Sequence, residues 1–82
     1  MSMMQRLSRH SALMRRMAET VQADVGEGLV QGRLTGEELR GAVLGCTTCD
    51  AETCEAWLDT HPDPPEPPAF CRNRDLLMRL RV

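Results

Sequence analysis

The stretch GCTTCDAETCEAWLD (residues 45–59) contains three of the four cysteines of this 82-residue chain. Cys46 and Cys49 are separated by two residues, a gap that lets neighbouring thiolates reach one metal centre from a tight loop. Cys54 follows in the first turn of an expected helix, where backbone N–H groups and the helix dipole favour a thiolate. The stretch therefore predicts a loop-to-helix corner at which three thiols come together.

The fourth cysteine, Cys71, follows the proline-rich run PDPPEPPA (residues 62–69), which cannot be helical and is expected to cross the surface in extended form. Such a loop can bring Cys71 back over the other three thiols. Four thiolates are sufficient for a closed four-cysteine site that holds either tetrahedral zinc or an iron–sulfur cluster. We therefore predict four metal ligands: Cys46, Cys49, Cys54 and Cys71.

The spacing of these cysteines indicates a metal more clearly than it indicates which metal. Zinc sites with four cysteine ligands usually consist of two paired knuckles, whereas this chain has one pair and two single cysteines. Three clustered ligands and a distant fourth, beside a proline-rich stretch, favour a 4Fe-4S cluster. Zinc is the alternative cofactor, and disulfides or free thiols are a third interpretation.

Helix patterns precede this corner. Apolar residues at three- and four-residue spacing predict a first helix that reaches back to Met3 or Met4, with Leu13, Met14, Met17, Val21 and Val25 on its apolar stripe. Asp24 and Glu27 resemble a capping box for a short second helix that carries Leu29 and Val30 inward and ends at Gly32.

Three further helices are expected around the cysteines. Thr35 and Glu38 form the capping box of a helix that ends at Gly45, with Leu39, Ala42 and Val43 on its buried face. Asp50 caps the next helix, residues 51–61, which places Cys54, Trp57 and Leu58 on one side. Asn73 caps a last helix that runs to Val82 and buries Leu76, Leu77 and Leu80.

These patterns predict an all-α fold, a small bundle of four or five short helices closed by the four-cysteine metal site, with a proline-rich loop before the last helix. We expect one domain over residues 1–82, because so short a chain has little core to divide. Its parts are N-terminal helices (1–33), a helix–cysteine loop–helix unit (34–61), the proline-rich loop (62–70) and a C-terminal helix (71–82).

Composition indicates the setting in which these thiols act. Arginines interrupt the first thirty residues, so no apolar signal-peptide core is present, and no run is long enough to span a membrane. We therefore expect a cytoplasmic protein, in which clustered cysteines are more often metal ligands or redox groups than disulfides. A nucleic-acid role is disfavoured, because the chain lacks aromatic stacking platforms and a helix-turn-helix pattern.

Acidic residues follow the first cysteines without any basic neighbour in the sequence. Between Gly41 and Glu66 there are six carboxylates and no arginine: Asp50, Glu52, Glu55, Asp59, Asp63 and Glu66. A solvated face with ordinary intramolecular ion pairs is one interpretation. The other is an acidic surround that steers a basic redox protein to the metal site.

Three side chains outside the ligand set are candidates for supporting roles. Trp57, one turn after Cys54, is expected to shield a cluster from water, a second-shell role that is compatible with core packing. His10, flanked by Arg9 and Ser11, is expected to be a surface or helix-packing residue rather than a ligand or proton carrier. His61 could replace a cysteine at a zinc site, but its position before Pro62 is typical of a helix C-terminus.

The pattern resembles a family of short, uncharacterised proteobacterial proteins. The likeness is carried by LTGEELRGAVLGCTTC, CEAWL and PPAFCRNRDLL, together with the opening RLSRHSALMRRMAE, and covers most of the chain. The resemblance implies that the four cysteines, Trp57 and Asn73 form one unit. It implies no reaction.

Three functions remain open at this stage. The first is a small iron–sulfur protein for electron transfer or redox sensing, and the second is a zinc-stapled helical adaptor that binds another protein. The third, a thiol redox enzyme using Cys46 and Cys49, is the weakest, because no strand–helix corner accompanies the motif. No catalytic residues are assigned, and a non-enzymatic role is favoured.

Overall fold

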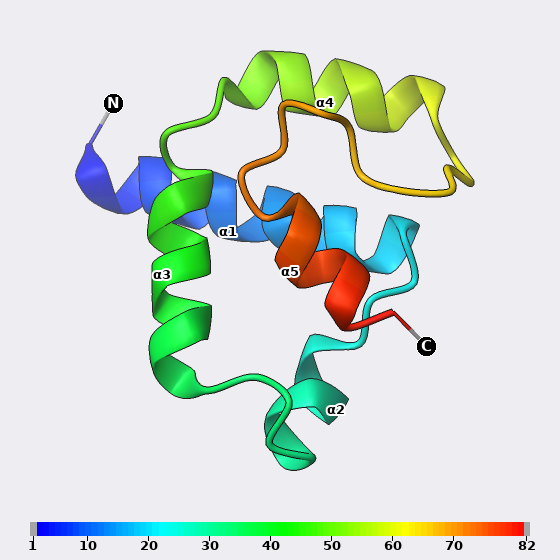
Figure 1. The fold of residues 1–82 in the computed structure, drawn as a ribbon. Coiled ribbons are helices and arrows are strands. Elements are labelled where there is room, and N and C mark those ends of the chain that lie inside the picture. Colours follow the sequence, from blue (N-terminus) through cyan, green and yellow to red (C-terminus); the bar gives the residue numbers. More distant parts are fainter. Residues whose placement is uncertain (1, 82) are drawn as a thin grey trace.

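The computed structural model describes residues 2–81 and has five helices in this range (Figure 1). They are α1 (Met3–Thr20), α2 (Val25–Val30), α3 (Gly36–Cys46), α4 (Ala51–Thr60) and α5 (Arg74–Arg79). The only β-type pairing within residues 2–81 is one isolated bridge between Ala23 and Arg81. The all-α prediction is therefore confirmed. Val82, the expected end of the last helix, lies outside the described residues.

Helix α1 is the centre of the structure and packs against both α3 and α4 (Figure 1). It begins with a capping box in which the Ser2 hydroxyl accepts from the Gln5 backbone N–H and the Gln5 side chain accepts from Ser2. The predicted apolar stripe is confirmed for Leu13, Met14 and Met17, which are buried. Its extension is wrong, because α1 ends at Thr20, so that Val21 is the C-cap and Val25 begins α2. None of the helices in the described range is long and apolar enough to cross a membrane.

Helix α2 packs differently from the prediction. Asp24 caps it by accepting from the Glu27 N–H, as expected, but Leu29 is partly exposed and Val30 is 81 % exposed. The predicted burial of these two residues is therefore wrong. The helix instead turns Gly28 inward, because the side chain of Leu80 occupies the space that a larger residue would need. Six residues are too few to show a repeating pattern of apolar positions. The contact with Leu80, and not the sequence of α2 itself, therefore decides which face of α2 is buried.

The caps of α3 and α4 agree with the sequence. Thr35 and Glu38 form the predicted capping box, and the Asp50 carboxylate accepts from the Glu52 N–H at the start of α4. Helix α5 starts at the expected place, but Asn73 makes no side-chain cap. Asn73 is buried and donates from Nδ2 to the Ala42 carbonyl, 2.9 Å away, so that it fastens α5 to α3.

Candidate metal centre

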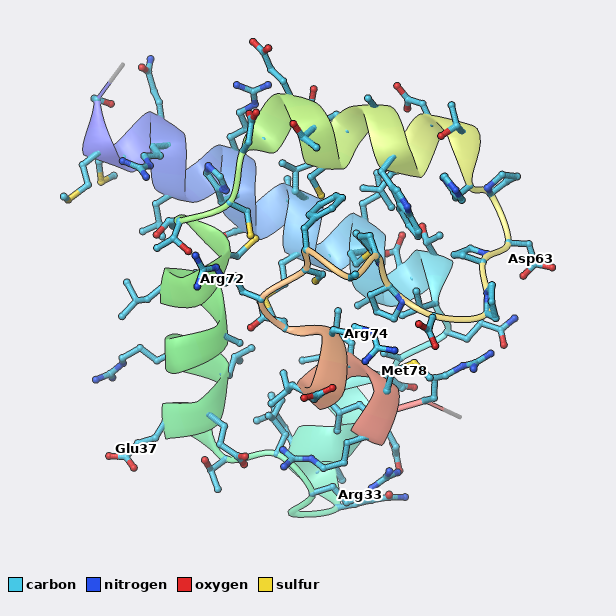
Figure 2. All side chains as sticks on the ribbon, turned by 45° about the horizontal axis from the view of Figure 1, so that its top comes forward. Arg33, Glu37, Asp63, Arg72, Arg74 and Met78 are labelled. Carbon is cyan, nitrogen blue, oxygen red and sulfur yellow. The ribbon has the colours of Figure 1, made fainter. Side chains whose placement is uncertain are left out.

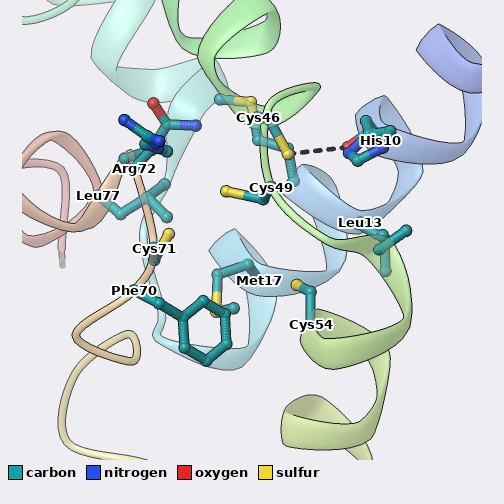
Figure 3. A pocket seen from close by; sticks show the side chains of 13 residues that line it. His10, Leu13, Met17, Cys46, Cys49, Cys54, Phe70, Cys71, Arg72 and Leu77 are labelled. Atoms are coloured by element: carbon teal, nitrogen blue, oxygen red, sulfur yellow. Dashed lines mark hydrogen bonds between the residues drawn. The ribbon is translucent and has the colours of Figure 1, made fainter.

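All four cysteines line a single cavity, and all four are free thiols (Figure 3). Cys46 ends α3, Cys49 lies in the following loop, Cys54 is in α4, and Cys71 comes from the segment before α5. The remaining wall is mostly apolar and includes Leu13, Met14, Met17, Ala51, Phe70 and Leu77. The cavity has a volume of about 20 Å³, enough for one water molecule.

Short turns bring the cysteines together. The Thr48 N–H donates to the Gly45 carbonyl and the Cys49 N–H donates to the Cys46 carbonyl, both at 3.1 Å, so the chain turns back at the end of α3. A third turn, from the Cys71 N–H to the Pro68 carbonyl at 3.0 Å, returns the proline-rich segment to the same place. The predicted convergence of all four cysteines is therefore present.

The thiols surround the cavity without closing on one point. Cys49, Cys54 and Cys71 turn their sulfur atoms toward the shared space (Figure 3). The Cys46 thiol instead donates to the His10 backbone carbonyl, with 3.3 Å between Sγ and the oxygen. Across residues 2–81, no three His, Cys, Asp or Glu side chains are placed to hold one metal ion as they stand.

Burial raises the pKa of three of the thiols, Cys46, Cys54 and Cys71. It raises the pKa of Cys46 and of Cys54 to about 11, with smaller upward contributions from the neighbouring thiols. Burial also raises the pKa of Cys71, opposed by hydrogen bonding from the Asn73 backbone. The expectation that a helix N-terminus favours a Cys54 thiolate is wrong, because burial of Cys54 outweighs the helix terminus and raises the pKa of this thiol. Protonated thiols are poor nucleophiles, which disfavours the thiol-enzyme interpretation.

Of the two aromatic residues, only Phe70 lines the cavity, and Trp57 packs against the core cluster that includes Cys54, in agreement with its predicted core packing. Trp57 is not among the residues that line the cavity, and it stacks on His61 with ring centroids 4.2 Å apart and planes 7° apart. His61 is exposed and lies at the C-cap of α4, as its position before Pro62 predicts. Phe70 contributes to the cavity wall and is 44 % exposed. Phe70 is therefore the aromatic side chain between the thiols and solvent.

His10 is a cavity residue that sequence reasoning did not select. Its side chain is only 5 % exposed, it lines the same cavity as the thiols, and its Nδ1 has no hydrogen-bond partner among the described residues. The expectation of helix packing is confirmed, but its position beside the cysteines was not foreseen. The helical spacing of the sequence could have indicated this burial, because His10 lies on the same face of α1 as Leu13, Met14 and Met17, nearer the N-terminus.

Three of the six carboxylates between Gly41 and Glu66 form ion pairs with arginines. Three ion pairs join α4 and the proline-rich segment to other parts of the fold: Arg9–Glu55 at 3.2 Å, Arg16–Asp59 at 2.8 Å and Arg74–Glu66 at 2.6 Å. These pairs are largely solvated and stabilise the fold little. Asp63, in contrast, projects from the loop at the edge of the molecule (Figure 2). Intramolecular pairing thus accounts for three of the six carboxylates.

The fold and the cavity define a small all-α protein with four free thiols gathered at one place. The chain belongs to the Family of unknown function (DUF6455), whose model matches residues 1–82. No curated protein and no solved structure matches the chain. Membership confirms the expected relation to a family without assigned function, whereas proteobacterial origin and a shared cysteine pattern stay predictions. A function must therefore be argued from the site.

Proposed function

We propose that the protein binds a 4Fe-4S cluster through Cys46, Cys49, Cys54 and Cys71 and acts in one-electron transfer or redox sensing. The observation that carries this proposal is the convergence of four free thiols on one apolar cavity. Thiolates are soft ligands suited to iron–sulfur clusters and zinc. Metal binding would replace the thiol protons, so the affinity for metal should rise with pH.

Cysteine spacing supports a cluster over a single ion, because three clustered cysteines with a distant fourth favour a four-iron cluster. Tetrahedral zinc, with Zn–S bonds of about 2.3 Å, requires sulfur atoms only about 3.8 Å apart. No three donors among the described residues are placed for one ion. In a four-iron cluster each cysteine binds a different iron, and so the sulfur atoms stand farther apart. The cysteines would therefore have to rearrange to hold either group.

A cluster would also require the cavity to widen. The present volume of about 20 Å³ admits one water molecule, and the outer wall is formed by Phe70 and Cys71. These residues follow the proline-rich segment, which is not helical. We expect cluster binding to move this segment outward while the residues from α1, α3 and α4 stay in place. Phe70 would then exclude water from the cluster, and so influence its potential, more directly than Trp57.

Electron transfer would take place at the side of the cavity nearest the surface. Partly exposed Phe70 lies there, and the same surface includes Asp50 and Thr53 of the α4 N-terminus. Asp50, Glu52 and Asp63 form no ion pair in the described part of the chain, and they could attract a basic redox protein as partner. The four cysteines would hold the cluster, which when bound would supply one-electron chemistry between a reduced donor protein and an oxidised acceptor. A cytoplasmic setting fits free thiols.

Metal and sulfide analysis of anaerobically purified protein, combined with electron paramagnetic resonance, tests this proposal. We expect about four irons and four sulfides per chain, broad visible absorption and a paramagnetic signal in one oxidation state. Cys71→Ser should lower the iron content strongly, whereas Ala69→Ser, a change to the same residue type at a nearby exposed position, should not. A colourless protein with stoichiometric zinc would overturn the cluster.

A zinc-stapled adaptor is the second candidate, and one surface favours it. Met3, Met4 and Leu7 of α1 and Leu44 of α3 are exposed apolar side chains. The elements that carry them meet where the Arg6 side chain donates to the Thr47 carbonyl at 2.6 Å. For an adaptor, chelation should unfold the zinc-loaded domain, and mild oxidants should leave its metal content unchanged.

A further inference from the structure

We propose that His10 donates a hydrogen bond from Nδ1 to a sulfur atom of the bound cluster and thereby raises its reduction potential. The inference rests on the proposed function and extends it to a residue outside the cysteine set. His10 is a positioning and tuning residue in this proposal, not a ligand. The four cysteines already supply one ligand for each iron of a four-iron cluster.

The first argument is the missing partner of the imidazole. His10 is only 5 % exposed, yet its Nδ1 forms no hydrogen bond with any residue in the described range. Buried polar nitrogens are nearly always hydrogen-bonded in folded proteins, because leaving one unpaired costs free energy. An orphan nitrogen in the wall of a thiol-lined cavity therefore points to a partner that occupies the cavity.

The second argument is the direct contact between His10 and a proposed ligand. The Cys46 thiol donates to the His10 backbone carbonyl at 3.3 Å (Figure 3). Once Cys46 binds iron, its sulfur carries no proton and cannot donate to this carbonyl. The sulfur would then turn toward the cavity, which places a negatively charged acceptor beside the imidazole. A neutral imidazole with hydrogen on Nδ1 is a suitable donor to it.

The third argument is the rigidity of the donor. His10 lies in the middle of α1, an 18-residue helix that packs against α3 and α4. Its neighbours on the same face, Leu13 and Met14, are buried and line the same cavity. The imidazole is therefore held in place before the cluster binds. Hydrogen bonds to cluster sulfurs stabilise the more negative, reduced state, and so they raise the reduction potential.

Voltammetry of anaerobically prepared protein tests the assignment. We expect His10→Leu to disfavour reduction by about tenfold in the redox equilibrium constant, or ~59 mV for one electron. His10→Asn should stay near the wild-type potential, because its amide can donate from a similar position. Met14→Leu is the matched control, since it changes the same wall without removing a donor. If His10→Leu does not fold, His10→Phe replaces it, because Phe keeps the ring volume without the nitrogen.

The outcomes separate the two proposals. A wild-type protein without a cluster would overturn both the proposed function and the role of His10. A wild-type cluster whose potential is the same in His10→Leu and His10→Phe would overturn only the role of His10. Pulsed electron paramagnetic resonance that shows the imidazole nitrogen bound to iron would also overturn the donor role. In the metal-free protein, His10→Leu should be at least as stable as wild type, a result that a purely structural hydrogen bond would not give.

Discussion

Two ends of the molecule are built on different principles. The apolar end, formed by Gly28, Leu34 and Leu80, is closed by two leucine side chains with 2 % exposure or less around a buried glycine. The cysteine end, formed by His10, Cys46, Cys49, Cys54 and Cys71, surrounds a cavity and includes an imidazole nitrogen without a partner among the described residues. The apolar end has no unpaired buried side-chain nitrogen or oxygen among the described residues. The cysteine end has the unpaired His10 Nδ1 and four free thiols.

The comparison separates the residues that stabilise this small domain from those proposed to bind a metal. Close packing at the apolar end stabilises the fold without any ligand. At the cysteine end, the unpaired nitrogen of His10 reduces the stability of the metal-free protein, as expected at a site where a ligand would satisfy it. The two ends should therefore respond differently to substitution and to metal.

The largest effect is expected at the apolar end. Leu80→Ala should lower the free energy of unfolding by about 2–5 kcal/mol, because Leu80 is 1 % exposed and fills the space over Gly28. Val30→Ala, an exposed apolar change in the adjoining helix, should cost less than about 0.5 kcal/mol. Denaturant unfolding of the metal-free protein measures both. Equal costs would mean that the apolar end is not closely packed.

A smaller loss is expected for Asn73→Ala, which separates α5 from α3 beside the cysteine end. The substitution leaves the buried Ala42 carbonyl without its donor and should cost roughly 1–3 kcal/mol in unfolding experiments. Thr60→Ala is the control, because the Thr60 hydroxyl donates to a backbone carbonyl at an exposed position. If both substitutions cost the same, the Asn73 bond does not join the two helices in solution.

Two glycine-to-alanine substitutions should have opposite signs. A Cβ at Gly28 would lie 2.7 Å from Leu80 Cδ2, so Gly28→Ala should destabilise by about 1–3 kcal/mol. Gly41 in α3 has open space around its Cβ position, so Gly41→Ala should stabilise by about 0.5–1 kcal/mol through helix propensity. Thermal unfolding measures both changes. A stabilising Gly28→Ala would show that Leu80 moves freely and that the apolar end is loose.

The smallest effect concerns the exposed link between α3 and α5. Hydrogen bonding from Arg79, then from the Thr35 backbone, lowers the pKa of Glu38. A lowered folded-state pKa contributes stability above the unfolded-state pKa of about 4.3, and this contribution is lost as the pH falls through the folded-state value. Glu38→Gln should therefore reduce the loss of stability between about pH 5 and pH 3, measured by denaturant unfolding. An unchanged acid profile would exclude this link.

Much of the fold could be predicted from local chemistry. Thr35, Asp50 and the α1 stripe gave correct helix starts and a correct buried face, because caps and periodicity act within a few residues. The burial of Leu29 and Val30 was wrong, because the face of α2 is decided by Leu80, a residue near the other end of the chain.

The candidate site was predictable in its cysteines and not in its surroundings. Cysteine spacing indicated which thiols converge, since short turns fix Cys46 and Cys49 locally. Phe70 and His10 reach the cavity through packing between distant segments, which one sequence does not reveal. Trp57 was expected there because it follows Cys54 by one turn, but it stacks on His61 instead.

Hydrogen exchange with and without metal tests the central claim most directly, because it compares the two ends in one experiment. Anaerobically prepared protein is compared before and after treatment with a chelator that would remove the proposed iron. We expect the metal to increase protection at residues 46–54 and 70–73 and to leave residues 24–34 nearly unchanged. Equal protection of residues 46–54 and 70–73 in the two samples, or a gain of the same size at both ends, would contradict the account.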